Sequence, residues 1–131
     1  MFEQYRGVES ILVADDEPVV LTLTKVILRS YGYNVLLATN GEEALELHRK
    51  SGPVDLVLTD VIMPQMTGPE LIHELKQETK DLRCVFMSGY DYDYIQKHGV
   101  HHLECAYLRK PFTPEALLKK VRQTLDNGSV N

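Results

Sequence analysis

The chain has 131 residues, a formal net charge of −5 and 44% hydrophobic residues. This length and composition suit one globular domain with its own hydrophobic core. The acidic balance argues against a nucleic-acid-binding surface over the whole domain, and no apolar run reaches the ~20 residues of a membrane span. We therefore expect a cytoplasmic domain without nucleic-acid or membrane contact, in which Cys84 and Cys105 are buried free thiols.

Short apolar runs alternate along the chain with segments of helical periodicity. Strands are predicted at 10–14, 34–38, 54–59, 82–87 and 106–108, and helices at 18–30, 39–51, 67–80 and 113–125, with a weak helix at 90–98. This alternation, with short links, predicts an α/β doubly wound fold whose parallel sheet is covered by helices on both faces. Residues 1–8 are expected to be a loose lead-in or linker, 9–125 the domain, and 126–131 a frayed tail.

Four of the predicted strands are followed at once by polar residues. The first ends in Asp15 and Asp16, the third in Asp60, the fourth in Ser88 and the fifth in Lys110. In a doubly wound parallel sheet, ligands bind beyond the carboxyl ends of the strands, and all these ends lie along one edge. We therefore expect the acids, the hydroxyl and the lysine to converge, although they are scattered in sequence.

Three carboxylates in a small volume repel one another unless a cation neutralises them. A hard divalent ion with oxygen ligands, Mg²⁺ first and Mn²⁺ second, is the expected cation. Lys110 adds a fixed positive charge that a metal site alone does not require, so an incoming dianion would explain it. Nucleophilic carboxylate, metal, lysine and hydroxyl together predict phosphoryl transfer to Asp60.

The same residues carry a family resemblance that covers roughly residues 10–125. The segments that carry it are Asp15-Asp16-Glu17, Asp60-Val61-Ile62-Met63-Pro64-Gln65-Met66-Thr67-Gly68, Ser88-Gly89 and Lys110-Pro111-Phe112. In this order they resemble the receiver domains of two-component response regulators. The resemblance implies a flavodoxin-like sheet of five parallel strands in the order 2-1-3-4-5.

Site roles follow from the resemblance position by position. Asp60 would be the phosphoacceptor, and the metal would be held by Asp16, Asp60, the backbone carbonyl of Ile62 and, through water, Asp15. The phosphoryl oxygens would be bound by Lys110 and by the hydroxyl of Ser88. Ser88 and Tyr107 would form the switch, and the residues at Ile62 and Tyr90 would tune the lifetime of the phosphoryl group.

The resemblance also implies partners. The phosphoryl donor would be the phosphohistidine of a histidine kinase or a histidine phosphotransfer domain. A homodimer through the face of the fourth helix, fifth strand and fifth helix is left open. Residues 87–90 and 108–117 are similar to receivers of hybrid sensor histidine kinases, so the chain could be an excised module or a stand-alone regulator. As such it is not expected to be an enzyme beyond its own phosphorylation and autodephosphorylation, although a parent protein could be a hybrid kinase.

Alternative functions are weaker on the same residues. An aspartate-nucleophile phosphohydrolase needs a second aspartate two positions after the nucleophile, where this chain has Ile62. A dinucleotide-binding oxidoreductase needs glycines where this chain has the acids of residues 15–17. A phosphorylation-independent interaction domain on the receiver fold remains as the alternative, against which the intact Asp60 and Lys110 argue.

The histidines and tyrosines between the fourth and fifth strands gave no site. His98, His101 and His102 near Cys105 match no standard zinc spacing and are expected to be solvated. Tyr90, Tyr92 and Tyr94 make the fourth helical segment unusual for a receiver, which leaves open how that face would signal.

Overall fold

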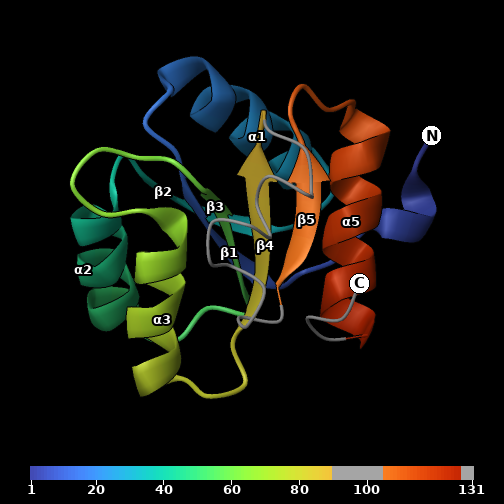
Figure 1. Ribbon diagram of the computed structural model, residues 1–131. Coiled ribbons are helices and arrows are strands. Elements are labelled where there is room, and N and C mark those ends of the chain that lie inside the picture. Colours follow the sequence, from blue (N-terminus) through green and yellow to red (C-terminus); the bar gives the residue numbers. More distant parts are fainter. Residues whose placement is uncertain (90–104, 128–131) are drawn as a thin grey trace.

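The computed structural model describes residues 1–89 and 105–127, and these form one parallel sheet with helices on both faces (Figure 1). The elements are η1 (Glu3–Tyr5), β1 (Ser10–Ala14), α1 (Pro18–Ser30), β2 (Asn34–Ala38), α2 (Gly41–Ser51), β3 (Leu56–Asp60), α3 (Gly68–Glu78), β4 (Arg83–Ser88), β5 (Ala106–Arg109) and α5 (Pro114–Asn127). The predicted segment at 90–98, with its tyrosines and His98, and also His101 and His102, lies outside the described residues.

The strand order is β2-β1-β3-β4-β5, and each neighbouring pair is parallel. The doubly wound, flavodoxin-like order 2-1-3-4-5 is therefore confirmed. β3 lies in the middle of the sheet and is buried along its whole length, which explains its continuous apolar run up to Thr59. The sheet thus holds Asp60, the last residue of β3, at a fixed point of its carboxyl edge.

Two cores separate the sheet from its helices. On one face, residues of α2 and α3 pack against alternate residues of β1, β3 and β4, among them Leu12, Val57 and Phe86. On the other face, α1 and α5 cover the intervening residues, among them Val13 and Leu58. The alternation follows from the pleat of each strand, which turns successive side chains to opposite faces.

Side chains cap the starts of three helices near the predicted positions. The Asn40 side chain accepts a hydrogen bond from the Glu43 backbone N–H at the start of α2, and Thr67 and Glu70 form a reciprocal capping box at the start of α3. The Thr113 hydroxyl accepts from the Ala116 N–H before α5. None of the described helices combines the length and the apolar character that crossing a membrane requires.

The N-terminal residues are not loose, which differs from our expectation. The Tyr33 hydroxyl donates to the Tyr5 carbonyl, and the Arg122 guanidinium on α5 donates to the Arg6 carbonyl. Phe2 and Tyr5 pack beside the second core. Aromatic side chains and one arginine thus tie the lead-in to the domain, and the proposed domain boundaries stay a prediction. α5 also continues through Asp126 to Asn127, beyond the predicted helix end.

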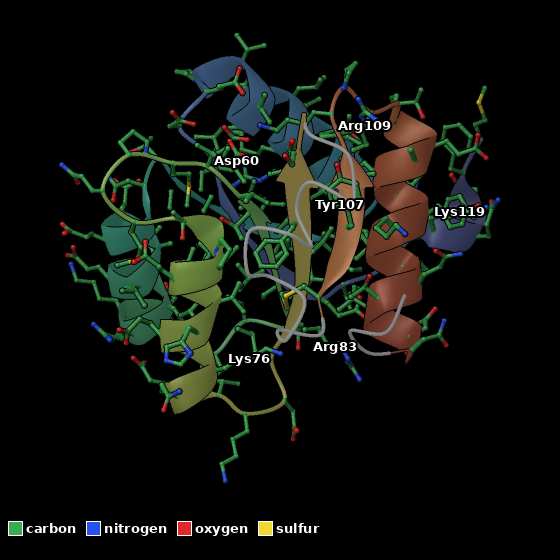
Figure 2. All side chains as sticks on the ribbon, viewed as in Figure 1. Asp60, Lys76, Arg83, Tyr107, Arg109 and Lys119 are labelled. Atoms are coloured by element: carbon green, nitrogen blue, oxygen red, sulfur yellow. A yellow bond between two sulfur atoms is a disulfide. The ribbon has the colours of Figure 1, made fainter. Side chains whose placement is uncertain are left out.

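The expectation of two free thiols is wrong. Cys84 on β4 and Cys105, just before β5, form a disulfide with their Cα atoms 5.0 Å apart (the yellow sulfur bond in Figure 2). Each cysteine lies in or beside an apolar run, which suggested separate packing roles. Sequence separation gave no sign that the pairing of β4 with β5 would place them next to each other.

Candidate functional site

The carboxyl edge of the sheet gathers the predicted site residues. Asp15 directly follows β1, Asp60 ends β3, Ser88 ends β4 and Lys110 directly follows β5. In Figure 2, Asp60 and Arg109 lie toward the same end of the sheet, and Arg83, at the start of β4, lies toward the opposite end. Convergence of these scattered residues was predicted from the topology of parallel sheets.

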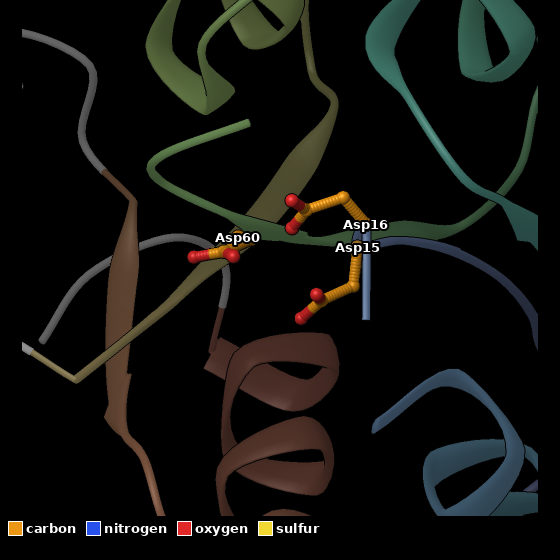
Figure 3. Close-up of side chains that lie close together, drawn as sticks. All are labelled: Asp15, Asp16 and Asp60. Carbon is orange, nitrogen blue, oxygen red and sulfur yellow. The ribbon is translucent and has the colours of Figure 1, made fainter. Parts of the chain in front are cut away.

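The three aspartates form a compact acidic cluster (Figure 3). Asp15, Asp16 and Asp60 each offer a carboxylate oxygen, and these oxygens all lie within 4.8 Å of one another. Asp15 and Asp60 are buried, whereas Asp16 is exposed. Oxygen donors of this kind, in surplus over nearby positive charge and open to solvent on one side, fit a hard divalent cation such as Mg²⁺.

Lys110 is the cation of the site, and only 14% of its side chain is exposed. Its Nζ lies 2.7 Å from Asp15 Oδ2, 3.3 Å from Asp60 Oδ2 and 3.2 Å from Glu17 Oε1. The pairing with Glu17 was missed, although its position in the acidic run before Pro18 could have signalled it. One ammonium therefore contacts three carboxylates.

Burial dominates the electrostatics of these groups. Desolvation raises the pKa of Asp60 to about 6, and the negative charge of Asp15 adds to this, while Lys110 acts in the opposite direction. Desolvation likewise raises the pKa of Asp15, although Lys110 opposes it. For Lys110, desolvation favours the neutral amine, but the hydrogen bond and charge of Asp15 and the charge of Asp60 outweigh it and raise the pKa to about 12. The lysine is therefore a permanent charge, and Asp60 titrates closer to neutrality than an ordinary aspartate.

The loop after β3 brings Asp60 and Ile62 to the surface of the site. The Gly68 N–H donates to the Val61 carbonyl, and the Gly68 Cα lies so close to the Asp60 carbonyl that a Cβ would collide with it. Glycine is therefore required at this close approach. Gln65 has a φ of 71°, which marks the tight turn inside the loop. Ile62 carries a half-exposed side chain, and the role of its carbonyl stays a prediction.

Ser88 and Tyr107 lie on paired strands beside Asp60. Ser88 is buried, and its carbonyl accepts hydrogen bonds from the Lys110 N–H at 2.8 Å and from the Tyr107 hydroxyl at 3.4 Å. Phe86 of β4 pairs in register with Tyr107 of β5. The structure thus brings together the two residues predicted as a switch, while their switching role stays a prediction.

A cavity of about 570 Å³ opens beside the acidic cluster. Its polar lining includes Asp60, Ser88 and Lys110. Its apolar lining was not anticipated: the residues are Val19, Val20, Leu23, Ile62, Pro111 and Phe112. The helical spacing of Val19 and Leu23 could have flagged an apolar strip on α1, because both are well exposed, at 76% and 49%.

The family model of the response regulator receiver domain matches residues 11–122 of this chain. This span includes every residue of the acidic cluster and Lys110. The chain therefore belongs to the receiver domain family, and its pocket of Asp15, Asp16 and Asp60 is typical of phospho-accepting modules of two-component signalling.

Curated relatives include a sensor kinase and transcriptional regulators. The chain is 36% identical over 121 residues to the sensor kinase CckA of Brucella abortus, and 30% identical over 122 residues to the alkaline phosphatase synthesis transcriptional regulatory protein PhoP of Bacillus subtilis. These matches cover 92% and 93% of the chain but 13% and 50% of the relatives. The chain thus corresponds to one part of each of these longer proteins.

Solved structures agree with this assignment. A CheY-like receiver domain protein of Methanospirillum hungatei is 29% identical with a TM-score of 0.83, over 93% of this chain and 97% of that one. The response regulator TrrA of Thermotoga maritima, in complex with Mg²⁺ and BeF, is 34% identical with a TM-score of 0.78, over 88% and 97%. The receiver domain of the hybrid histidine kinase CckA is 33% identical with a TM-score of 0.74, over 88% and 98%.

Proposed function

We propose that this receiver accepts one phosphoryl group on Asp60 from a phosphohistidine and uses Ser88 and Tyr107 to convert it into a surface change. The observation that carries the proposal is the pairing of a nucleophilic carboxylate, Asp60, with a largely buried permanent cation, Lys110 Nζ, 3.3 Å away. The cavity beside them has room for a phosphoryl group. Phosphoryl transfer needs such positioning and charge stabilisation more than further protein chemistry.

A divalent cation fits the acidic cluster. Asp15, Asp16 and Asp60 would hold Mg²⁺, with Mn²⁺ as a substitute, and the Ile62 carbonyl is a further proposed ligand. The bound ion would supply neutralisation of charge on the transferring group. The burial that raises the pKa of Asp60 makes its ionised form costly when the cluster binds no cation, which favours binding of one.

The covalent step is a substitution at phosphorus. A carboxylate oxygen of Asp60 forms a bond to the phosphorus, the phosphorus–nitrogen bond of the donor imidazole breaks, and the leaving nitrogen takes a proton from solvent. Lys110 holds its positive charge beside the phosphoryl oxygens, at the position where it now pairs with Asp15 and Asp60. Attack of water on the acyl phosphate later releases inorganic phosphate and restores the carboxylate.

The apolar strip on α1 is where we place the donor protein. Val19, Leu23 and Val26 are exposed on one side of α1, and the first two also line the cavity of Asp60. A histidine kinase or phosphotransfer domain that covers this strip would bring its phosphohistidine to Asp60. Val26 lies outside the cavity. The variant Val26→Glu should therefore slow transfer from such a donor and leave phosphorylation by acetyl phosphate unchanged. Equal rates of transfer from the protein donor to wild type and to Val26→Glu would contradict this placement.

Intact mass tests the central assignment. Wild type incubated with Mg²⁺ and acetyl phosphate, or with a phosphorylated histidine domain, should gain the mass of one phosphoryl group, and Asp60→Asn should gain none. Asp81→Asn, an exposed aspartate between α3 and β4, is the matched control and should behave as wild type. If wild type gains no phosphoryl group from either donor, a phosphorylation-independent interaction domain would be favoured. A full adduct on Asp60→Asn would overturn the choice of acceptor.

The larger protein is part of the proposal. The similarity to CckA supports a C-terminal receiver of a hybrid histidine kinase, in which the chain itself has no activity beyond its own phosphorylation and dephosphorylation. We propose that residues 9–125 make up the receiver domain. We also place this domain in the cytoplasm, where the donor kinase would be phosphorylated. Neither nucleic acid nor a membrane surface is a proposed partner of the domain.

A further inference from the structure

We propose that Cys84 and Cys105 form a reversible dithiol–disulfide site that reacts with small or protein disulfides. Its oxidation links the β5 end of the chain covalently to β4, a few residues before Ser88 and Tyr107. The redox site itself goes beyond the proposed function and does not depend on it. Its effect on the response to phosphorylation rests on the proposed function. The experiments below separate the two.

Strand register places the cysteines side by side. Val85 pairs with Ala106 and Phe86 with Tyr107, so Cys84 and Cys105 occupy the next position before these pairs. Their Cα atoms are 5.0 Å apart, within the spacing that a disulfide spans without backbone movement. The reduced pair would therefore meet the geometric requirement for oxidation in the folded domain, with the two strands already in place.

Burial gives the two sulfurs different access. Cys84 is fully buried in the core beneath α2 and α3, whereas Cys105 is partly exposed at the entry to β5. Exchange should therefore begin at Cys105. Its thiolate attacks an external disulfide and releases one thiol, and the Cys84 thiolate then attacks the Cys105 sulfur and releases the second. The protein loses two hydrogens while one external disulfide becomes two thiols, and reduction by an external dithiol reverses both steps.

The domain does not need this bond as a permanent support. Its size is sufficient for a core without cross-links, and two clusters of buried side chains already hold the helices to the sheet. In a compartment where glutathione keeps thiols reduced, a disulfide in a protein is typically transient and redox-sensing. Both points favour a bond that forms and breaks over a constitutive one.

The bond lies on the face of the sheet that carries the predicted switch. Cys84, Phe86 and Ser88 are alternate residues of β4 and share one face, and Cys105 and Tyr107 share it on the β5 side. The disulfide joins the strands two residues before the Phe86–Tyr107 pair and closes the intervening chain into a covalent ring. Oxidation should therefore restrain movement of Tyr107 relative to Ser88.

Thiol chemistry tests the site without reference to phosphorylation. The native protein, equilibrated for hours with oxidised glutathione and then denatured in iodoacetamide, should take up no label, and after equilibration with reduced dithiothreitol it should take up two. Cys84→Val should accumulate one glutathione on Cys105, and Cys105→Ala should accumulate none. Native protein that keeps two labelled thiols under oxidised glutathione overturns the proposal. So does a bond that dithiothreitol fails to reduce in the native state.

Amide hydrogen exchange tests the coupling. Oxidised wild type should exchange more slowly than reduced wild type over 83–88 and 105–109 and should unfold at a temperature higher by about 10 °C. The doubly substituted Cys84→Val, Cys105→Ala protein should show no redox dependence. Where acetyl phosphate phosphorylates the protein, the change in exchange at β5 should be larger in the reduced form, and an equal change in both forms overturns the coupling. If the protein forms and breaks the disulfide as described but is not phosphorylated, the proposed function is refuted and the redox site stands.

Discussion

Two clusters, each of one basic side chain among acidic ones, lie at opposite edges of the sheet and behave in opposite ways. At the carboxyl edge, Lys110 faces Asp15, Glu17 and Asp60. At the amino edge, Arg122 of α5 binds Glu9 in a two-nitrogen pair at 2.6 and 3.1 Å. Both clusters set one basic side chain against several acids, yet the pKa of Asp60 is raised and that of Glu9 is lowered.

The difference lies in how completely each carboxylate is satisfied. Hydrogen bonds from Arg122 lower the pKa of Glu9 to about 2, and Arg122 also donates to the Tyr33 hydroxyl and to Asp126. A planar guanidinium can divide its donors among several partners. A single ammonium cannot satisfy three carboxylates, so desolvation prevails at Asp60. We therefore expect the amino-edge cluster to stabilise the fold, and the carboxyl-edge cluster to bind a further cation and an anion as proposed above.

The largest expected effect that separates the edges is on phosphoryl transfer. Lys110→Ala removes the charge beside the phosphoryl oxygens and should slow phosphorylation by acetyl phosphate about 10²-fold, as the loss of one stabilising donor does elsewhere. Lys119→Ala on the exposed side of α5 is the control and should leave the rate unchanged. Stopped-flow or time-resolved intact mass measures both. A Lys110→Ala rate equal to wild type would remove the proposed role of the lysine.

The amino-edge cluster should dominate stability. Arg122→Ala removes the guanidinium that donates to Glu9 and to the Arg6 carbonyl and should lower the free energy of unfolding by about 3 kcal/mol. The neighbouring exposed Gln123→Ala should change it by less than about 0.5 kcal/mol. Urea denaturation measures the difference. Similar midpoints for the two variants would show that the cluster stabilises little.

At the carboxyl edge, replacing a charged residue should raise the free energy of unfolding instead of lowering it. Because the pKa of Asp60 is raised from 3.8 to about 6, the folded chain holds this proton more tightly than the unfolded chain, and the ionised carboxylate opposes folding increasingly from pH 3.8 and fully above about pH 6. Asp60→Asn should therefore raise the free energy of unfolding near pH 7 by about 2 kcal/mol without Mg²⁺. Below the ordinary value of 3.8 this advantage should vanish.

Addition of Mg²⁺ should change the stability difference between wild type and Asp60→Asn. Wild type should gain thermal stability when Mg²⁺ is added, because binding to the folded state alone shifts the unfolding equilibrium, and Asp60→Asn should gain less. Asp81→Asn serves again as the control and should follow wild type with and without the ion. Destabilisation by Asp60→Asn near pH 7 without Mg²⁺ would contradict the electrostatic contrast between the edges.

The smallest effect is the acid dependence of the Arg122 cluster. The pKa of Glu9 is lowered, so its contribution to stability is complete above the ordinary value of 4.5 and is lost as the pH falls towards about 2. Between pH 7 and pH 3, wild type should lose about 1 kcal/mol more than Glu9→Gln, after allowance for partial exposure of the carboxylate. Equal losses in the two proteins would show that the pair is not stabilising.

Local patterns in the sequence predicted most of the architecture. Apolar runs and helical periodicity predicted the described strands and helices nearly at their observed ends, as at the starts of α2 and α3. Because all parallel strands present their carboxyl ends at one edge, the convergence of Asp15, Asp60, Ser88 and Lys110 followed from the element order alone. The strand order itself came from the resemblance to receivers.

Tertiary structure decided which of these groups contact one another. Pairing of β4 with β5 in one particular register, not any feature of the local sequence, brought Cys84 to Cys105 across 21 positions. Packing of α5 against the N-terminal residues brought Arg122 to Glu9 across 113 positions. Likewise the burial of Asp60, which raises its pKa, depends on the helices and loops around the sheet edge. Sequence periodicity reports which face of an element is buried, whereas register and packing between distant segments determine its partners and the local dielectric.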